Sequence, residues 1–296
     1  MARSFMRVAE PWAYLSPALV LLILVLLVPL IIGIGYSFRH FTAFNSRYVG
    51  LGEYRAMLRD PALGQALFNT LWWTAGSLFF QFLLGLGLAL LLNRRFRGRA
   101  VVQAVVFLPW AVPSFLAGLT WAWLFNPIIG PIPHWLLAVG LQAKPRDILA
   151  IPSVAMWGPI IANIWFGIPF FAITLLAALK SIPADLYEAA TLDGAGRWRQ
   201  FWHITLPGLR PMIYFAVTLS VIGGLQLFDE AFILTNGHGG PDQAGLTAAL
   251  YFYREAFDFD DFGGSAAMSW ILFCFVALLT WLTNVALRPR DAEAGS

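Results

Sequence analysis

Side chains that could carry out catalysis or bind a metal ion are few and scattered in this sequence. The only cysteine, Cys274, falls inside an apolar run, so neither a disulfide nor a thiolate metal site is predicted. Lys144 and Lys180 both lie outside any G-x-x-x-x-G-K-[ST] pattern, so the chain has no phosphate-binding loop of its own. The histidines are dispersed, and no two of them have the spacing of a metal-binding pair: His40, His134, His203 and His238.

Carboxylates also give no sign of a membrane-embedded enzyme. Such an enzyme would need paired catalytic acids, an H-E-x-x-H sequence, or a catalytic Ser/Lys or Ser/His pair at the membrane, and we identify none of these in the sequence. The one acidic cluster is Asp258, Asp260 and Asp261, set among phenylalanines, and we expect it to be solvated or to contact a partner protein. The sequence therefore predicts a chain that is not an enzyme and that binds no metal and no cofactor of its own.

The elements that must position any functional residue are strongly apolar. Of the 296 residues, 59% are hydrophobic and 12% are charged, whereas soluble domains have about 45–50% apolar and about 25% charged residues. These values predict an all-α polytopic membrane protein with a single transmembrane domain over residues 1–296, and the net charge of +3 does not indicate nucleic acid. Six apolar runs are long enough to cross a hydrocarbon core about 30 Å thick: residues 12–36, 67–92, 101–125, 153–179, 212–234 and 264–287.

Basic residues favour one side of the predicted membrane. The two terminal segments, the turn 93–99 and the loop 180–210 together carry 12 Lys and Arg residues, and the opposite loops carry 7. The positive-inside rule therefore places both termini and the loop 180–210 in the cytoplasm. The cluster Arg94–Arg99 contributes most, because the rule is most reliable in short loops.

The longest polar interval that is closely flanked by apolar runs covers residues 181–211. A short helix around Glu188 is predicted to end near Gly194, because glycine tolerates the left-handed conformation that often ends helices. A second helix is expected from Arg197, and Pro207 is expected to end it. The sequence thus predicts a helix-turn-helix between two membrane spans.

This loop resembles the EAA loop of ABC importer permeases. Glu188-Ala189-Ala190 is followed after three residues by Gly194, and after nine more residues by Ile204-x-Leu206-Pro207. In that family the loop is a cytoplasmic coupling helix that docks into a cleft of the ATPase subunit, and ATP and Mg are bound by that partner. The resemblance implies that these residues couple the chain to an ATPase: Glu188, Ala189, Ala190, Asp193, Gly194, Ile204, Leu206 and Pro207.

Two further segments resemble the six-span sugar-importer permeases of the maltose, glycerol-phosphate and trehalose type. Residues 49–54 resemble the V-G-L-x-N-Y stretch, with Glu53 where Asn is usual. Residues 235–241 resemble the T-x-G-G-P segment, with His238 as an extra residue. The resemblance implies the ABC type I importer permease fold, in a bacterial or archaeal cell membrane. It also implies import of a sugar or oligosaccharide with a second permease subunit, two ATPase subunits and an extracytoplasmic solute-binding protein.

Polar residues inside predicted spans four and five are the candidates for a solute path. Gln226, Asp229 and Glu230 lie near the end of span five, and they share one face only if the helix is regular there. Asn163 lies between two prolines of span four, where a broken helix would free backbone groups for a ligand. Alternatively, the two acids lie at the outer interface and the two amides bond to neighbouring helices.

An ion-coupled secondary transporter is the main alternative function. Such a carrier should have buried acids within several spans, because intramembrane acids mark ion and proton pathways. Spans one, two, three, four and six have no Asp or Glu between their ends. The sequence therefore favours a permease that is driven by a separate ATPase.

Overall fold

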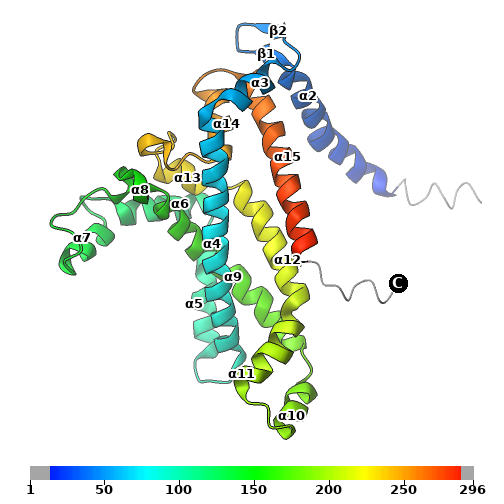
Figure 1. The fold of residues 1–296 in the computed structure, drawn as a ribbon, viewed down its shortest axis with the longest axis vertical. Coiled ribbons are helices and arrows are strands. Elements are labelled where there is room, and N and C mark those ends of the chain that lie inside the picture. Colours follow the sequence, from blue (N-terminus) through cyan, green and yellow to red (C-terminus); the bar gives the residue numbers. More distant parts are fainter. Residues whose placement is uncertain (1–13, 288–296) are drawn as a thin grey trace, which may run out of the picture. The chain divides into compact units, whose positions relative to one another are not determined.

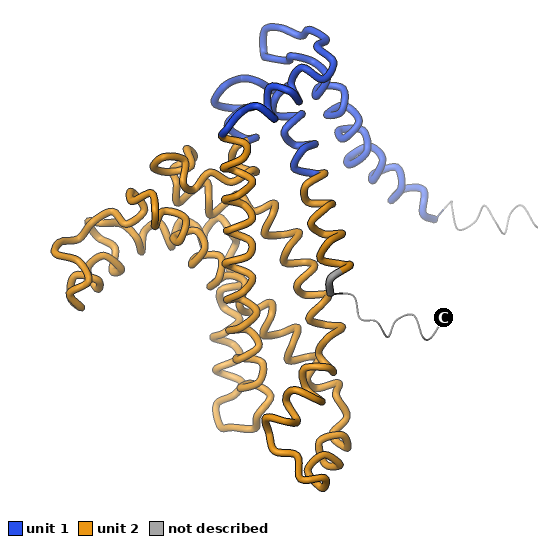
Figure 2. The backbone as a smooth tube through the Cα atoms, in the orientation of Figure 1, with its two compact units in different colours: residues 1–61, 252–273 blue, residues 62–251, 274–296 orange. Residues whose placement is uncertain are grey.

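The structure is a computed structural model that describes residues 14–287. The basic residues of both terminal segments and the first two residues of the predicted first span lie outside this range. The chain divides into two compact units, coloured separately in Figure 2. Unit 1 consists of residues up to 61 together with 252–273, and unit 2 consists of residues 62–251 together with those from 274 onward.

The described chain is almost entirely helical, which confirms the prediction of an all-α membrane protein (Figure 1). Five helical stretches are long and apolar enough to span a membrane: Tyr14–Ser37, Pro61–Asn93, Pro152–Ser181, Arg197–Leu225 and Phe262–Val285. A sixth candidate is a pair of helices, Arg99–Ala111 and Ser114–Phe125, which are bent by 97° relative to each other. Counting this pair as one span gives six.

Unit 1 combines a long apolar helix with a small hairpin. Its elements are η1 (Ile23–Leu27), α2 (Val28–Ser37), β1 (Arg39–Phe41), β2 (Ser46–Tyr48), α3 (Gly52–Arg59), the end of α14 (Ala248–Phe257) and the first part of α15 (Phe262–Leu287). The two strands pair antiparallel with His40 opposite Arg47. The most apolar window of the first helical stretch has no buried residue, so its side chains are available to lipid or to another chain.

Unit 2 holds the remaining helices. They are α4 (Pro61–Asn93), α5 (Arg99–Ala111), α6 (Ser114–Phe125), α7 (Pro131–Ala138), η2 (Ile148–Ala150), α8 (Pro152–Ala155), α9 (Trp157–Ser181), α10 (Ala184–Leu192), α11 (Arg197–Gln200), η3 (Phe201–Thr205), α12 (Leu206–Leu225), α13 (Asp229–Leu234) and η4 (Pro241–Gln243). Its main core lies between α4, α9 and α12, where Leu92, Leu175 and Leu209 are fully buried together.

Prolines act differently in the third and fourth predicted spans. Val112 is extended before Pro113, as the ring of a following proline requires, and the chain bends sharply between α5 and α6. The fourth span was expected to be broken, but α9 runs without interruption from Trp157 to Ser181. Pro159 lies in its first turn, where no backbone N–H is needed, and Pro169 is accommodated inside the helix.

The fifth span ends earlier than the sequence suggested. The run 212–234 was predicted as one helix, whereas α12 ends at Leu225 and α13 begins only at Asp229. The break follows the pair Gly223-Gly224, which lowers helix propensity, and the backbone N–H of Gln226 bonds back to the carbonyl of Gly223. The polar end of the predicted span therefore belongs to a separate short helix.

Candidate functional site

The candidate coupling helix α10 lies at one end of unit 2, the same end as the turn that joins α4 to α5 (Figure 1). It begins directly after Pro183, whose extended backbone suits the position before a helix. None of its residues is buried, and Leu186 and Leu192 are 51% and 89% exposed. The Glu188-Ala189-Ala190 run thus lies on a helix whose surface is open to a partner protein.

The end of α10 has the geometry predicted for it. The helix stops at Leu192, and Gly194 adopts a φ of +77°, which strains any residue with a side chain. The N–H of Asp193 donates to the carbonyl of Ala189 (3.0 Å), and the N–H of Ala195 donates to that of Ala190 (2.8 Å). These bonds satisfy carbonyls that a helix end otherwise leaves unpaired.

Side-chain bonds attach α10 to the helix that follows it. The Tyr187 hydroxyl lies 3.0 Å from Thr205 Oγ1, and Gln200 Nε2 donates to Thr191 Oγ1 at 2.9 Å. Beyond these bonds, the chain enters the core at Leu209, which is fully buried against α4 and α9. α10 is therefore joined by side-chain hydrogen bonds to the helical stretch that continues into α12.

Pro207 does not end the second helix of the loop, contrary to the sequence expectation. The chain stays helical from Arg197 to Leu225, through α11, η3 and α12. Pro207 lies in the first turn of α12, directly after the π-helical turn η3, so its missing N–H falls where the hydrogen-bonding pattern already changes. Ile204 and Leu206 flank this change of pattern and are half-buried.

An open cavity of about 290 Å³ lies within unit 2 between α4, α5, α9 and α12, and we call it the polar cavity after the few polar side chains in its mainly apolar lining. Asn163, a predicted solute-path residue, lines this cavity. Hydroxyl residues such as Thr74 and Ser220 line it as well. Gln81 Nε2 donates to Asn163 Oδ1 at 2.7 Å and to the Asn163 carbonyl at 2.8 Å. Aromatic side chains, including Trp110 and Phe166, complete the lining.

Gln81 was missed by the sequence reasoning. It is 6% exposed, and its amide fits against α9 because residue 167 is glycine. A Cβ atom added at Gly167 would lie 2.4 Å from the Gln81 amide carbon. The available signal was the type of residue: Gln81 is the one amide in the middle of the apolar run 67–92.

The three polar residues after span five do not act together. Gln226 is exposed at the end of α12, outside the lining of the polar cavity, and Asp229 is half-buried and accepts a hydrogen bond from Ser114 at the start of α6. A regular helix would have placed both on one face with Glu230, but the break after Leu225 separates them. Only Asn163, of the four candidates, lines the polar cavity.

Glu230 is the most deeply buried carboxylate of unit 2. It is 0% exposed, and neither of its side-chain oxygens has a hydrogen-bond partner among the described residues. The Asn163 side chain interacts with it, at a looser geometry than a full hydrogen bond. Glu230 is therefore buried within the protein, close to the amide that lines the cavity.

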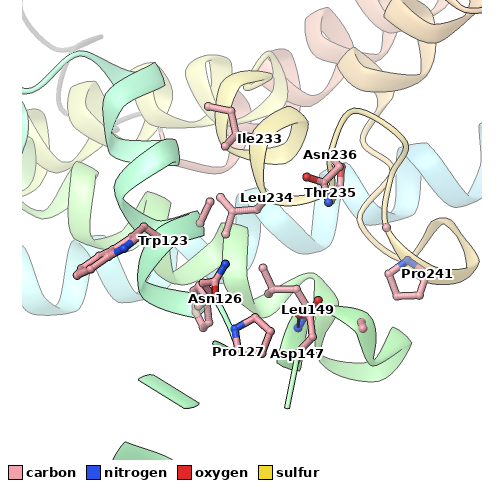
Figure 3. Close-up of a pocket in the computed structure, with 14 residues that line it drawn as sticks. Trp123, Asn126, Pro127, Asp147, Leu149, Ile233, Leu234, Thr235, Asn236 and Pro241 are labelled. Atoms are coloured by element: carbon pink, nitrogen blue, oxygen red, sulfur yellow. Dashed lines mark hydrogen bonds between the residues drawn. The ribbon is translucent and has the colours of Figure 1, made fainter. Parts of the chain in front are cut away.

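A larger cavity of about 590 Å³ opens among the loops that follow α6 and α13 (Figure 3). Figure 3 shows that Asn126, directly after α6, and Leu234, at the end of α13, come from different elements of the cavity wall. Leu149, from η2, also lines the cavity. Asn126 Oδ1 accepts from the N–H groups of Ile128 and Ile129, which fixes the turn after α6. The positive-inside rule predicts that these loops lie outside the cell.

Comparisons with known proteins assign the chain to a family. Residues 81–289, most of the chain, match the model of the family described as "Binding-protein-dependent transport system inner membrane component". The chain belongs to this family. It is thus a multi-pass transport permease subunit, and the prediction of an ABC importer permease is confirmed.

Individual relatives of this permease cover most of its length. It is 36% identical over 233 residues to the trehalose/maltose transport system permease protein MalF of Thermococcus litoralis, covering 79% of this chain and 77% of MalF. It is 33% identical over 284 residues to the lactose transport system permease protein LacF of Rhizobium radiobacter, covering 94% of each chain. Its fold matches a chain of a bacterial ABC transporter involved in the import of alginate, with a TM-score of 0.83, 25% identity and 97% of both chains covered.

Proposed function

We propose that this permease forms half of the path by which an ATP-driven importer takes up a sugar or oligosaccharide. The observation that carries the proposal is the connection from α10 through Tyr187 and Thr205 to α12, a helix that lines the polar cavity. Movement of an exposed coupling helix would thereby change the walls of the cavity. The relatives named for trehalose/maltose and for lactose support a carbohydrate as the solute.

The lining of the polar cavity suits a neutral, hydroxyl-rich solute. It offers amide and hydroxyl groups from Gln81, Asn163, Thr74 and Ser220, and aromatic surface from Trp110. Amides and hydroxyls can both donate and accept hydrogen bonds, as sugar hydroxyls require. No Lys, Arg or His of the described chain lines this cavity, so it does not offer the cationic partner that a phosphate or carboxylate group would favour.

ATP hydrolysis, the second half of the path and solute delivery belong to partner chains in this proposal. Two ATPase subunits bind ATP and Mg and receive α10, a second and different permease supplies the other half of the path, and a solute-binding protein delivers the solute from outside. The membrane surrounds the spans, and both termini lie in the cytoplasm. An ion-coupled carrier is not favoured, because an exposed coupling helix attached to a cavity wall has no use in a carrier without an ATPase.

The test is reconstitution of the permease with its paired permease and ATPase in liposomes, with its binding protein added outside. ATP-dependent accumulation of a radiolabelled disaccharide such as maltose, trehalose or lactose supports the proposal. Accumulation that persists without ATP and follows an imposed ion gradient would instead establish an ion-coupled carrier.

The orientation has a separate test. Reporters fused after Arg97 and after Pro207 should report the cytoplasm, and reporters fused near Pro131 and Gly240 should report the outside. The turn 93–99 and α10 lie at one end of unit 2, as this assignment requires (Figure 1). Access to the Glu188 loop from outside the cell would contradict both the orientation and the coupling role.

A further inference from the structure

Unit 1 brings together three metal-ligating side chains from distant parts of the sequence. His40 lies on β1, Glu53 on α3, and Asp261 directly before α15. One potential ligand atom from each residue lies within 4.8 Å of the others. Sequence spacing gave no sign of this group, because 13 residues separate the first two and the third belongs to the other chain segment of unit 1.

The close packing of two chain segments holds the group in place. A Cβ atom at Gly263 would lie 2.1 Å from the carbonyl oxygen of Arg39, so only glycine lets the start of α15 approach β1 this closely. On the same side, the N–H of Ala43 donates to Asp260 Oδ2 at 3.1 Å. Asp261 is itself oriented, because its Oδ1 accepts from the N–H of Gly264 at 2.8 Å.

The two carboxylates of the group favour the binding of a cation. Glu53 is 8% exposed, and its described ion pair is with His40 Nδ1, which lies 3.0 Å from Glu53 Oε1. No ion pair of Glu53 or Asp261 with Lys or Arg is found among the described residues. Two carboxylates at this separation repel each other in a partly buried environment unless a positive charge lies between them.

The ligand set decides which cation fits. One imidazole nitrogen and two carboxylate oxygens are ligands that zinc accepts, whereas calcium takes six to eight oxygens and magnesium usually keeps several waters. Zinc binds such ligands at about 2.0–2.2 Å, which places neighbouring ligands of a tetrahedral site about 3.4 Å apart. The 3.0 Å between His40 and Glu53 is close to that separation, so small side-chain movements suffice.

We propose that His40, Glu53 and Asp261 bind a zinc ion that joins the hairpin of unit 1 to the start of α15. Water would complete a tetrahedral site with these three protein ligands. The ligands lie in two loops that the orientation predicts to be outside the cell, and His40 is exposed, so an ion from the medium can reach them. The proposal does not depend on the transported solute.

Zinc binding to the intact transporter complex tests the proposal. The complex is prepared free of metal with Cys274→Ser in the permease, so that its only thiol cannot take up zinc. Titration against a chromogenic zinc chelator should find one equivalent per permease that depends on this group. His40→Ala and Glu53→Gln should each weaken this binding by about tenfold or more. Cobalt substituted at the site should give the absorption bands of a four-coordinate ion with nitrogen and oxygen ligands.

His238→Ala is the matched control, because His238 is an exposed histidine of another loop in unit 2. This variant should keep the parent affinity for zinc. Equal zinc affinity in all three variants, or no saturable equivalent in the parent complex, would overturn the proposal. If the complex with Glu53→Gln does not assemble, the complex with Asp261→Asn is measured instead. The amide oxygen of that substituted side chain can still accept the hydrogen bond from the N–H of Gly264. Sugar uptake measured in parallel distinguishes loss of the metal site from failure of the transport proposal.

Discussion

The coupling helix and the polar cavity of unit 2 are built in opposite ways. α10 has no buried residue, and its residues follow one another in the chain. The cavity is open but is lined by four helices, and one contact in its lining joins Gln81 to Asn163, 82 residues apart in the sequence. A surface that meets a protein partner can thus be made from one local segment, whereas a site that encloses a small solute needs side chains from several.

The first prediction tests α10 as the surface that receives force. Glu188→Lys reverses a charge on the exposed helix and should reduce ATP-dependent uptake about thirtyfold or more, as loss of a central interface residue does. The protein should still be present in the membrane, because α10 contributes no buried residue. Uptake in liposomes and ATP hydrolysis are measured together.

The control for this prediction is Asp185→Asn, which removes a charge from the same helix and leaves Glu188 in place. It should retain most of the uptake. Full uptake in Glu188→Lys, or equal losses in both variants, would show that α10 does not act through Glu188.

The second prediction tests the cavity. Gln81→Leu removes the donor that orients Asn163 at the cavity, so the half-saturating solute concentration should rise about tenfold, which corresponds to about 1.4 kcal/mol of binding free energy. Gly167→Ala should have the same effect, because its methyl group occupies the space of the Gln81 amide. Both are measured as initial uptake rates against solute concentration.

Gln226→Ala is the matched control, since this amide lies outside the lining of the cavity. Its uptake curve should match that of the parent. A change in Gln226→Ala without one in Gln81→Leu would move the solute path from the cavity to the break after α12.

The coupling helix could be predicted from the sequence more completely than the cavity could. The end of α10 at Gly194 could be predicted, because helix formation and the turn are local properties, whereas the expected helix end at Pro207 was wrong. The spans could be located by hydropathy, but the break after Leu225 was missed, although Gly223-Gly224 lowers helix propensity there. Gln81 could have been noticed as a lone amide in an apolar run, but its partner, like that of Glu53, is determined only by the packed structure.

The third prediction concerns Glu230, the buried acid close to the amide that lines the cavity. A buried carboxylate without a hydrogen-bond partner lowers stability, so Glu230→Gln should raise the thermal unfolding midpoint by about 2–4 °C. Asp229→Asn should not raise it, because Asp229 is half-buried and has a hydrogen bond from Ser114. A lower midpoint for Glu230→Gln would show that the carboxylate is needed where it lies.

The fourth prediction concerns the bond that joins the two regions. Tyr187→Phe removes the contact with Thr205, which is worth about 0.5–1.5 kcal/mol. Uptake per ATP hydrolysed should fall about twofold, with little change in the amount of assembled complex. Tyr48→Phe, a change at an exposed tyrosine of the hairpin, should leave this ratio unchanged. An unchanged ratio in Tyr187→Phe would mean that α10 transmits force through the backbone alone.

The π-helical turn at residues 201–205 lets the helix between α10 and the core carry one residue more than a regular α-helix of the same phase. A π turn closes its hydrogen bonds one residue later than an α turn does, so it holds one extra residue. Deleting one residue from this turn would leave a regular α turn, and α10 would keep about its present direction relative to α12. Deleting one residue from the regular part of α12 would instead rotate everything before it by about 100°. The same change of chain length is therefore absorbed at the π turn and redirects the coupling helix when it falls elsewhere in α12.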